Sequence, residues 1–168
     1  TADFVGASGM TGTRTFGPIA VKAFEGRGID PETASRYHVY TAKARQSETG
    51  ESEVAPDANG NIIVFPFIDH GRECGAKYRA PGKRFWQQKG GRKTFWNADV
   101  MDDPALENGS AALIITEGEI DALTALDCGF PFTVSVPDGA PPVREGDDPE
   151  AVEEPADPEQ ERTGKFEF

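Results

Sequence analysis

The sequence is poor in cysteine and contains no long hydrophobic run. Its two cysteines, Cys74 and Cys128, stand far apart without the CxxC spacing of metal sites. His38 and His70 do not complete a zinc-finger pattern with them, so we predict structural thiols and no zinc site in this chain. No apolar stretch approaches the roughly 18 residues of a membrane-spanning helix, so we expect no membrane partner.

Hydrophobic residues are also scarce, and charge is distributed unevenly along the chain. Hydrophobic residues make up 37% of the 168 residues, and the formal net charge is −12. These values predict that a sizeable part of the chain is not packed in a core. The acidic total would argue against nucleic-acid binding, but residues 72–93 carry eight basic side chains against one acid. The total charge is therefore a poor guide to partners.

The basic segment interleaves its cations with aromatic rings. Lysine and arginine neutralise phosphates and rings stack on unpaired bases, so the segment is typical of a surface that binds single-stranded DNA. The candidate nucleic-acid-binding residues are Lys77, Arg79, Lys83, Arg84, Trp86, Lys89, Arg92 and Lys93. In an alternative interpretation the cations line a solvent-exposed face and the rings belong to the core, namely Phe85, Trp86, Phe95 and Trp96.

Acidic residues dominate the C-terminal stretch. Residues 145–161 carry nine acids and no base, and residues 143–163 contain several prolines and almost no large apolar side chain. Such a segment cannot bury enough surface to offset its ordering entropy, so we expect residues 143–163 to be mobile. A solvated insertion and a nucleic-acid mimic that lies on the basic segment are both compatible with this composition.

A strand–helix–strand pattern spans residues 111–139. Residues 111–116 are apolar and β-branched, which predicts a buried strand, and residues 132–136 predict a second strand. Between them, Thr116 and Glu119 have capping-box spacing, apolar residues recur at helical spacing, and Gly129 is placed to end the helix. The connection is long enough for the two strands to be parallel, as in a doubly wound sheet.

Two carboxylates lie at the predicted carboxyl end of the first of these strands, where such sheets form their sites. Glu117 ends the strand, Gly118 allows a sharp turn, and Asp121 follows about one helical turn later. Paired carboxylates suit magnesium, which prefers oxygen ligands and binds substrate phosphates. The alternative is that both acids stabilise the helix through its dipole and have no catalytic role.

The earlier part of the chain predicts helices followed by an antiparallel meander. Residues 18–27 and a segment capped by Asp30 predict two helices, because proline occupies the first turn of each. Residues 46–60 are polar and predict a loop, and Pro66 predicts an edge position or a bulge in its strand. The predicted strands are residues 39–42, 61–68, 73–79, 83–88 and 93–97, and residues 101–108 predict a short helix.

The residues around Glu117 resemble the first motif of the Toprim domain, which bacterial-type primases and topoisomerases share. TEGEIDAL at residues 116–123 follows an apolar strand, as in that motif. SVPDGA at residues 135–140 resembles the version in bacteriophage primase-helicases and the related mitochondrial replicative helicases. The resemblance implies that Glu117 is the acid/base and metal-site residue, supported by Asp121. The Asp-x-Asp of the family is missing, so the chain looks like a fragment cut inside its Toprim domain.

Together these patterns predict an α+β fold with three regions. Residues 1–15 form a flexible lead-in, and residues 16–109 form a basic subdomain of two helices and an antiparallel meander. Residues 110–168 form the start of a parallel, Rossmann-like Toprim sheet, truncated and followed by the mobile acidic segment.

The resemblance implies a fragment of a DNA primase or primase-helicase. Such a fragment binds single-stranded DNA template and contributes to Mg²⁺-dependent synthesis of RNA primers from nucleotides, and it is expected to be inactive alone. A helicase domain is expected downstream, and the expected location is the cytoplasm, in bacterial or phage replication machinery. The alternative is a non-catalytic single-stranded-DNA-binding module of a replicative helicase with a degenerate Toprim domain. Toprim nucleases and recombination mediators stay open as further classes.

Overall fold

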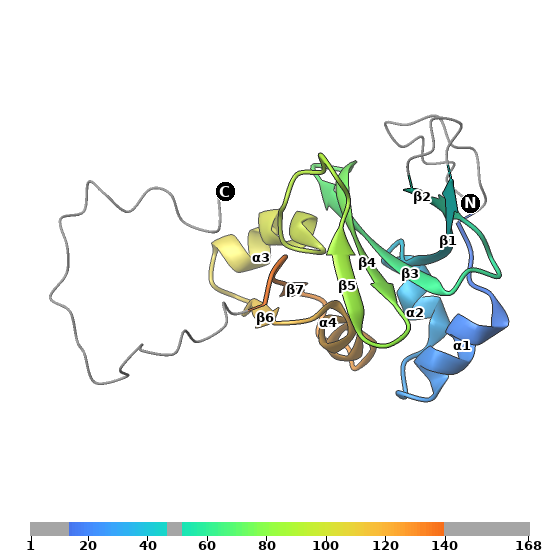
Figure 1. The fold of residues 1–168 in the computed structure, drawn as a ribbon. Coiled ribbons are helices and arrows are strands. Elements are labelled where there is room, and N and C mark those ends of the chain that lie inside the picture. The colour runs from blue at the N-terminus through green and yellow to red at the C-terminus, as the bar shows by residue number, and fades with distance from the viewer. Residues whose placement is uncertain (1–13, 47–51, 140–168) are drawn as a thin grey trace, which may run out of the picture.

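A computed structural model describes residues 14–46 and 52–139, which form a five-stranded antiparallel sheet and a smaller parallel unit beside it (Figure 1). The predicted lead-in lies almost entirely outside the described residues, and the predicted mobile segment at 143–163 lies wholly outside them. The antiparallel sheet, the helices and the parallel strand pair confirm the α+β prediction. Within the described ranges, every helix is too short or too polar to cross a membrane.

Two short helices begin the described chain, and proline fixes the start of each. Both carry proline in the first turn and bury apolar residues against the sheet, and they are α1 (Pro18–Glu25) and α2 (Pro31–Arg36). The Asp30 side chain accepts a hydrogen bond from the backbone N–H of Glu32, as predicted for the N-cap of α2.

The antiparallel sheet has the strand order β2-β1-β3-β4-β5. Its strands are β1 (Tyr40–Gln46), β2 (Ser52–Pro56), β3 (Ile62–Asp69), β4 (Arg72–Ala80) and β5 (Arg84–Gln87). The predicted loop at residues 46–60 is wrong in part, because residues 52–56 pair with β1, and such pairing overrides a polar local pattern. The predicted strand at residues 93–97 is also wrong, since Trp96 alone in it forms a β-bridge.

Pro66 occupies a central strand, contrary to the predicted edge position. Strand β3 lies between β1 and β4, yet its pairing with β1 covers residues 62–64 alone. Pro66 therefore lies opposite Ala76 of β4 and has no strand partner on its other side among the described residues. The register shifts between residues 67 and 68, so the predicted bulge is present immediately after the proline.

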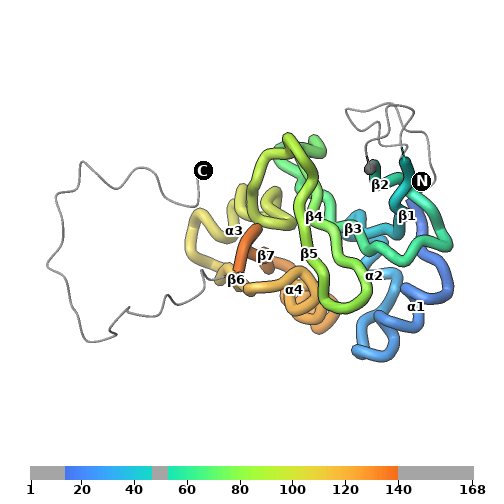
Figure 2. Tube along the Cα trace, viewed as in Figure 1, coloured from blue at the N-terminus to red at the C-terminus, as the bar shows by residue number. Residues whose placement is uncertain are grey.

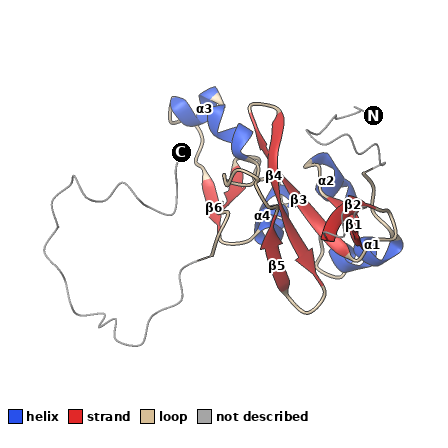
Figure 3. Ribbon diagram, turned by 45° about the horizontal axis from the view of Figure 1, so that its top comes forward, coloured by secondary structure: helices blue, strands red, loops and turns tan. Residues whose placement is uncertain are grey.

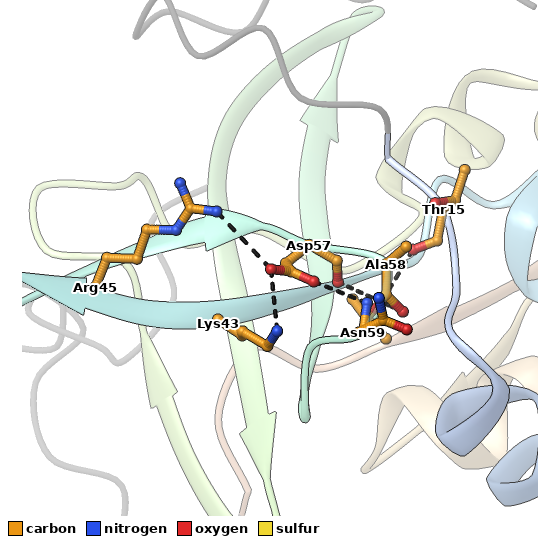
Figure 4. A network of polar contacts seen from close by, with 7 residues as sticks. Thr15, Lys43, Arg45, Asp57, Ala58 and Asn59 are labelled. Atoms are coloured by element: carbon orange, nitrogen blue, oxygen red, sulfur yellow. Dashed lines mark hydrogen bonds and ion pairs between the residues drawn. The ribbon is translucent and has the colours of Figure 1, made fainter.

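A polar network holds the turn between β2 and β3 (Figure 4). One carboxylate oxygen of Asp57 accepts a hydrogen bond from the backbone N–H of Asn59, and the other lies 3.2 Å from Lys43 Nζ. These contacts lower the pKa of Asp57, and the Asn59 N–H is the largest cause. Thr41 Oγ1 donates a hydrogen bond to the carbonyl oxygen of Thr15 at 3.0 Å, so the segment before α1 is also tied to the sheet.

The parallel unit confirms the predicted order of strand, helix and strand. Its two strands pair in parallel, and its elements are β6 (Ile114–Thr116), α4 (Glu119–Asp127) and β7 (Thr133–Ser135). Gly129 has a φ of 88° and ends α4, and its N–H and that of Phe130 donate to carbonyl oxygens of the last turn. The predicted burial of β6 is wrong, because Ile115 is 58% exposed. Among the described residues, β7 is the one strand that pairs with β6.

The start of α4 differs from the predicted capping box. The N-cap is Gly118 rather than Thr116, and no side chain caps the first turn. The Thr116 hydroxyl lies 3.1 Å from the carbonyl oxygen of Gly118 and 3.2 Å from that of Val134, which ties β6 to β7. Glu119 does not reach back to the helix start, because its carboxylate pairs with Lys77 of β4.

Helices α1, α2 and α4 share one hydrophobic cluster with the central strand β3. Figure 2 shows the orange trace of α4 beside the green trace of β4 and β5, and the turned view in Figure 3 shows the same arrangement. The cluster contains large buried side chains from both parts of the chain, among them Phe24, Phe65, Phe67, Trp96 and Leu123. A second cluster, centred on Tyr40, Val64 and Tyr78, lies on the other face of the sheet.

The segment between the two sheets connects them through backbone as well as side chains. It contains η1 (Ala98–Asp102) and α3 (Pro104–Glu107), and Asp103 caps α3 by accepting from the N–H of Ala105. Before it, Trp96 and Ser135 exchange backbone hydrogen bonds of 3.0 and 3.3 Å. This bridge attaches the antiparallel part to the edge of β7.

Candidate active site and nucleic-acid interface

The two candidate carboxylates lie where β6 ends and α4 begins. Glu117 follows the last residue of β6, Asp121 lies in the first turn of α4, and both are exposed. A side chain at Gly118 would lie 3.3 Å from Asp121 Oδ2. Glycine at this position therefore leaves room for Asp121 near the strand end, and both acids line one pocket.

The pocket has a volume of about 460 Å³ and lies between the start of α4 and the β4–β5 hairpin. Acids come from one side and cations with rings from the other. The lining residues are Arg27, Lys77, Arg79, Phe85, Trp86, Gln87, Glu117, Gly118, Glu119, Ile120, Asp121, Pro137, Asp138 and Gly139. The structure thus brings the two predicted catalytic acids beside three predicted nucleic-acid-binding residues, Lys77, Arg79 and Trp86.

Strand pairing explains why these cations face α4 rather than solvent. Lys77 lies opposite Phe65 on one side and Gln87 on the other, and Arg79 lies opposite Phe85. Directly opposed residues share a face of the sheet, and Phe65 belongs to the cluster that contacts α4. The alternative interpretation, in which the cations line a solvent-exposed face, therefore does not fit Lys77 and Arg79 of β4.

The aromatic residues of the basic segment divide between core and surface. Trp96 is 1% exposed, whereas Phe85 and Trp86 are 48% and 38% exposed. The Arg79 guanidinium lies 5.1 Å from the centre of the Phe85 ring, and Trp86 packs against Tyr78 with centroids 5.4 Å apart. The core interpretation holds for Trp96, and the two rings of β5 remain available for stacking.

A buried ion pair forms part of the pocket wall. Lys77 Nζ lies 2.8 Å from Glu119 Oε1, and the two side chains are 11% and 3% exposed. Removal of two charges from water is costly, and the short distance between the two groups offsets part of that cost. Among the described residues Glu119 Oε1 has no aligned hydrogen-bond donor, so proximity of the Lys77 ammonium is what compensates its charge.

Arg79 lies near two acids and a second arginine. Burial lowers the pKa of Arg79 and the nearby Arg27 lowers it further, whereas Glu119 and Asp121 act to raise it. Arg27 comes from the turn after α1, and no local pattern in the sequence singles it out. Two neighbouring guanidinium groups repel each other, and an anionic group between them would relieve that repulsion.

The loop after β7 is fastened to the hairpin. Gln87 Nε2 donates to the carbonyl oxygen of Pro137 at 3.0 Å and to Asp138 Oδ1 at 2.9 Å. Lys93 Nζ lies 3.0 Å from Asp138 Oδ2. Gln87 and Asp138 were not among the predicted site residues, because their contacts join distant parts of the chain.

Five of the predicted nucleic-acid-binding residues lie outside the pocket. Lys83 and Arg84 are exposed at the β4–β5 turn, and Lys89 is exposed after β5. Arg92 and Lys93 are both exposed and paired with aspartates. The predicted set therefore extends along the hairpin and beyond it rather than forming one cluster.

The described carboxylates do not form a complete metal site. Within residues 14–46 and 52–139, no group of three or more His, Cys, Asp or Glu side chains lies close enough to share an ion. Glu119 and Asp138 are already paired with lysines. Glu117 and Asp121 remain, and one or two carboxylates beside a phosphate are donors that magnesium commonly uses.

Two curated plant proteins are similar to the chain in sequence. The Twinkle homolog protein, chloroplastic/mitochondrial, of Arabidopsis thaliana is 32% identical over 120 residues, which cover 70% of this chain and 16% of that protein. The Primase homolog protein of the same plant is 36% identical over 80 residues, which cover 48% of this chain and 22% of that protein. No family model matches the chain.

The fold is also that of a solved primase structure. The catalytic core of DnaG superposes with a TM-score of 0.50 at 16% identity, covering 71% of this chain and 47% of that one. The sequence relatives and the fold together support a Toprim primase-like domain in the described region. This conclusion confirms the resemblance drawn from residues 116–123 and the fold class expected with it.

The primase-like domain corresponds to a small part of its relatives. The chain spans 16% and 22% of the lengths of the two plant proteins, so their activities as whole proteins are not transferred to it. The name of the Twinkle homolog places that protein in chloroplasts or mitochondria, so a cytoplasmic location for this chain stays a prediction. The domain boundary at residue 109 also stays a prediction.

Proposed function

We propose that this primase-like domain binds single-stranded DNA template and contributes Glu117 to Mg²⁺-dependent synthesis of RNA primers in a larger primase or primase-helicase. The observation that supports this most is the shared pocket, in which exposed acids at the end of β6 face cations and the exposed Phe85 ring of the β4–β5 hairpin. Nucleotidyl transfer beside a template needs both kinds of group, because acids hold metal and cations offset the charge of phosphates.

In this proposal Glu117 and Asp121 supply oxygen donors at the strand end, and other parts of the parent protein supply the remaining donors. Magnesium bound there would offset charge on the reacting phosphates. Arg27 and Arg79 hold a phosphate across the pocket from the acids, because two close guanidinium groups favour an anion. Because donors are missing from the described residues, the domain alone is expected to be inactive.

The template lies along the hairpin in this proposal. Phe85 on the pocket face of β5 and Trp86 on its opposite face stack on unpaired bases, which a duplex does not offer, and the exposed Lys83 and Arg84 contact backbone phosphates. The incoming nucleotides and a downstream helicase domain are the other expected partners.

The variant Glu117→Gln in the parent protein tests the catalytic part. Primer synthesis is expected to fall by about two to four orders of magnitude, because a positioned acid/base is lost while the shape is kept. Single-stranded DNA binding should persist, since the hairpin is intact. Glu107→Gln is the matched control, because Glu107 is an exposed glutamate of α3 outside the pocket. Full primer synthesis by Glu117→Gln would contradict the proposal.

A non-catalytic role in single-stranded DNA binding is a second candidate. It is favoured by the exposure of Phe85 and Trp86, which does not depend on the acids. The parent would then be a replicative helicase with a degenerate Toprim domain. In that case Glu117→Gln changes neither DNA binding nor helicase activity, so the same variant separates the two candidates.

A further inference from the structure

Charged contacts attach both ends of α4 to the antiparallel part of the molecule. At the start of the helix, Glu119 forms the buried pair with Lys77 of β4. At its end, Asp127 Oδ1 accepts a hydrogen bond from the Thr33 hydroxyl at 2.6 Å, and Asp127 Oδ2 accepts one from the N–H of Asp30 at 3.2 Å. The helix that follows Glu117 is therefore fixed to β4 at one end and to the start of α2 at the other.

The first of these contacts is unusual in its environment. Both side chains are almost fully buried, and an apolar pair of similar volume would often stabilise a fold as well or better. An ion pair in a low-dielectric setting differs from apolar packing in that it fixes one geometry, since any displacement leaves a buried charge uncompensated. The Lys77–Glu119 pair is therefore better suited to setting orientation than to adding stability.

We infer that Lys77 and Glu119 are positioning residues that set the orientation of the first turn of α4, and with it Glu117, relative to the β4–β5 hairpin. Glu117 lies two residues before Glu119, and Arg79 lies two residues after Lys77 on the same face of β4. One contact thus fixes the distance between the acidic and basic sides of the pocket. The consequence for primer synthesis rests on the proposed function, whereas the structural part of the inference does not.

The double variant Lys77→Met/Glu119→Gln tests the structural part, because it removes the pair without leaving a buried charge unpaired. Residual dipolar couplings of the 168-residue chain report the orientation of α4 relative to the antiparallel sheet. In the wild-type chain we expect the couplings measured for α4 and for the sheet to fit the arrangement described above. In the double variant we expect couplings that do not fit that arrangement. The matched control is Lys43→Met/Asp57→Asn, which removes an ion pair within the sheet (Figure 4) and should leave α4 in place.

The same double variant in the parent protein tests the functional part. A displacement of a reacting group by about 1 Å can cost about 100-fold in rate, so kcat for primer synthesis is expected to fall by roughly 10- to 100-fold. The dissociation constant for single-stranded DNA should change much less, because the exposed cations and rings of the hairpin remain. A loss confined to DNA affinity would contradict a positioning role.

The outcomes distinguish this inference from the proposed function. An unchanged orientation of α4 in the double variant overturns the inference, whatever the activity of Glu117→Gln. Loss of the folded state in the double variant also overturns it, because the pair would then be a condition for folding. A changed orientation of α4, together with full primer synthesis by Glu117→Gln, supports the inference and removes the proposed function.

Discussion

Glu117 and Glu119 are separated by one glycine and yet lie in opposite environments. Glu117 is exposed in the pocket, whereas Glu119 is 3% exposed and paired with Lys77. The backbone turn at Gly118 directs the two side chains differently, so one can meet ligands and the other holds the helix to β4. Of the two nearby acids in this motif, Glu117 is therefore open to ligands and Glu119 has a structural role.

The buried pair predicts an asymmetric response to single and double substitutions. Lys77→Met leaves the Glu119 carboxylate buried without a counter-charge and is expected to lower the free energy of unfolding by about 3–5 kcal/mol. The double variant Lys77→Met/Glu119→Gln should recover much of this loss. Urea unfolding of the wild type, the two single variants and the double variant measures both effects. A Lys77→Met chain as stable as wild type would contradict the burial of the pair.

Tyr40 predicts a loss of stability at alkaline pH. Burial raises its pKa to about 12, against about 10 for an unfolded tyrosine. The neutral Tyr40 side chain therefore stabilises the folded state fully below a pH of about 10. This stabilisation is lost as the pH rises from about 10 to about 12. The free energy of unfolding should fall by about 2–3 kcal/mol across this interval, as followed by urea unfolding. Tyr40→Phe should remove most of the fall, and an equal fall in that variant would exclude Tyr40 as its cause.

The β4–β5 hairpin is the element to which DNA binding is assigned. Lys83→Ala/Arg84→Ala should weaken binding to an oligothymidine and reduce the slope of log K against log salt by about 1.4, since each phosphate contact on a single strand adds about 0.7. Fluorescence anisotropy across a salt series measures both quantities. Lys22→Ala/Lys43→Ala removes the same charge from α1 and β1 and should change the slope little. Equal slopes for the two variants would remove the hairpin from the interface.

Elements with local signals were predictable, and those that depend on distant partners were not. Asp30 as a cap and Gly129 as a terminator act within a few residues, and α2 begins and α4 ends as predicted. Strand β2 was not predicted because it depends on pairing with β1. The predicted capping box does not form because the Glu119 carboxylate pairs with Lys77 of β4. In the site, the strand-end position of Glu117 followed from the order of elements. Arg27 did not, because its approach to Arg79 is a property of the folded chain.

At the scale of the whole molecule, Trp96 joins the two sheets in one core. Its ring lies 5.9 Å from that of Phe65 and 6.1 Å from that of Tyr37, and its backbone bridges to Ser135 of β7. The antiparallel part and the parallel unit should therefore unfold in a single transition rather than separately.

Trp96→Ala is expected to lower the free energy of unfolding by about 3–5 kcal/mol, because it opens a large cavity in the shared core. Differential scanning calorimetry measures the loss and shows whether the transition stays single. Trp86→Ala is the matched control, since this ring is 38% exposed and its removal should cost about 1 kcal/mol or less. Similar losses for the two tryptophans would contradict the division of rings between core and surface.

Strand β6 pairs with β7 along one edge, and no other strand among the described residues covers its second edge. Ile115 on this strand is 58% exposed. A strand edge that has no strand partner within the described ranges, next to an exposed isoleucine, can accept another strand. Within the described part of the chain, this edge is therefore the place where a further strand could extend the parallel sheet beyond β6.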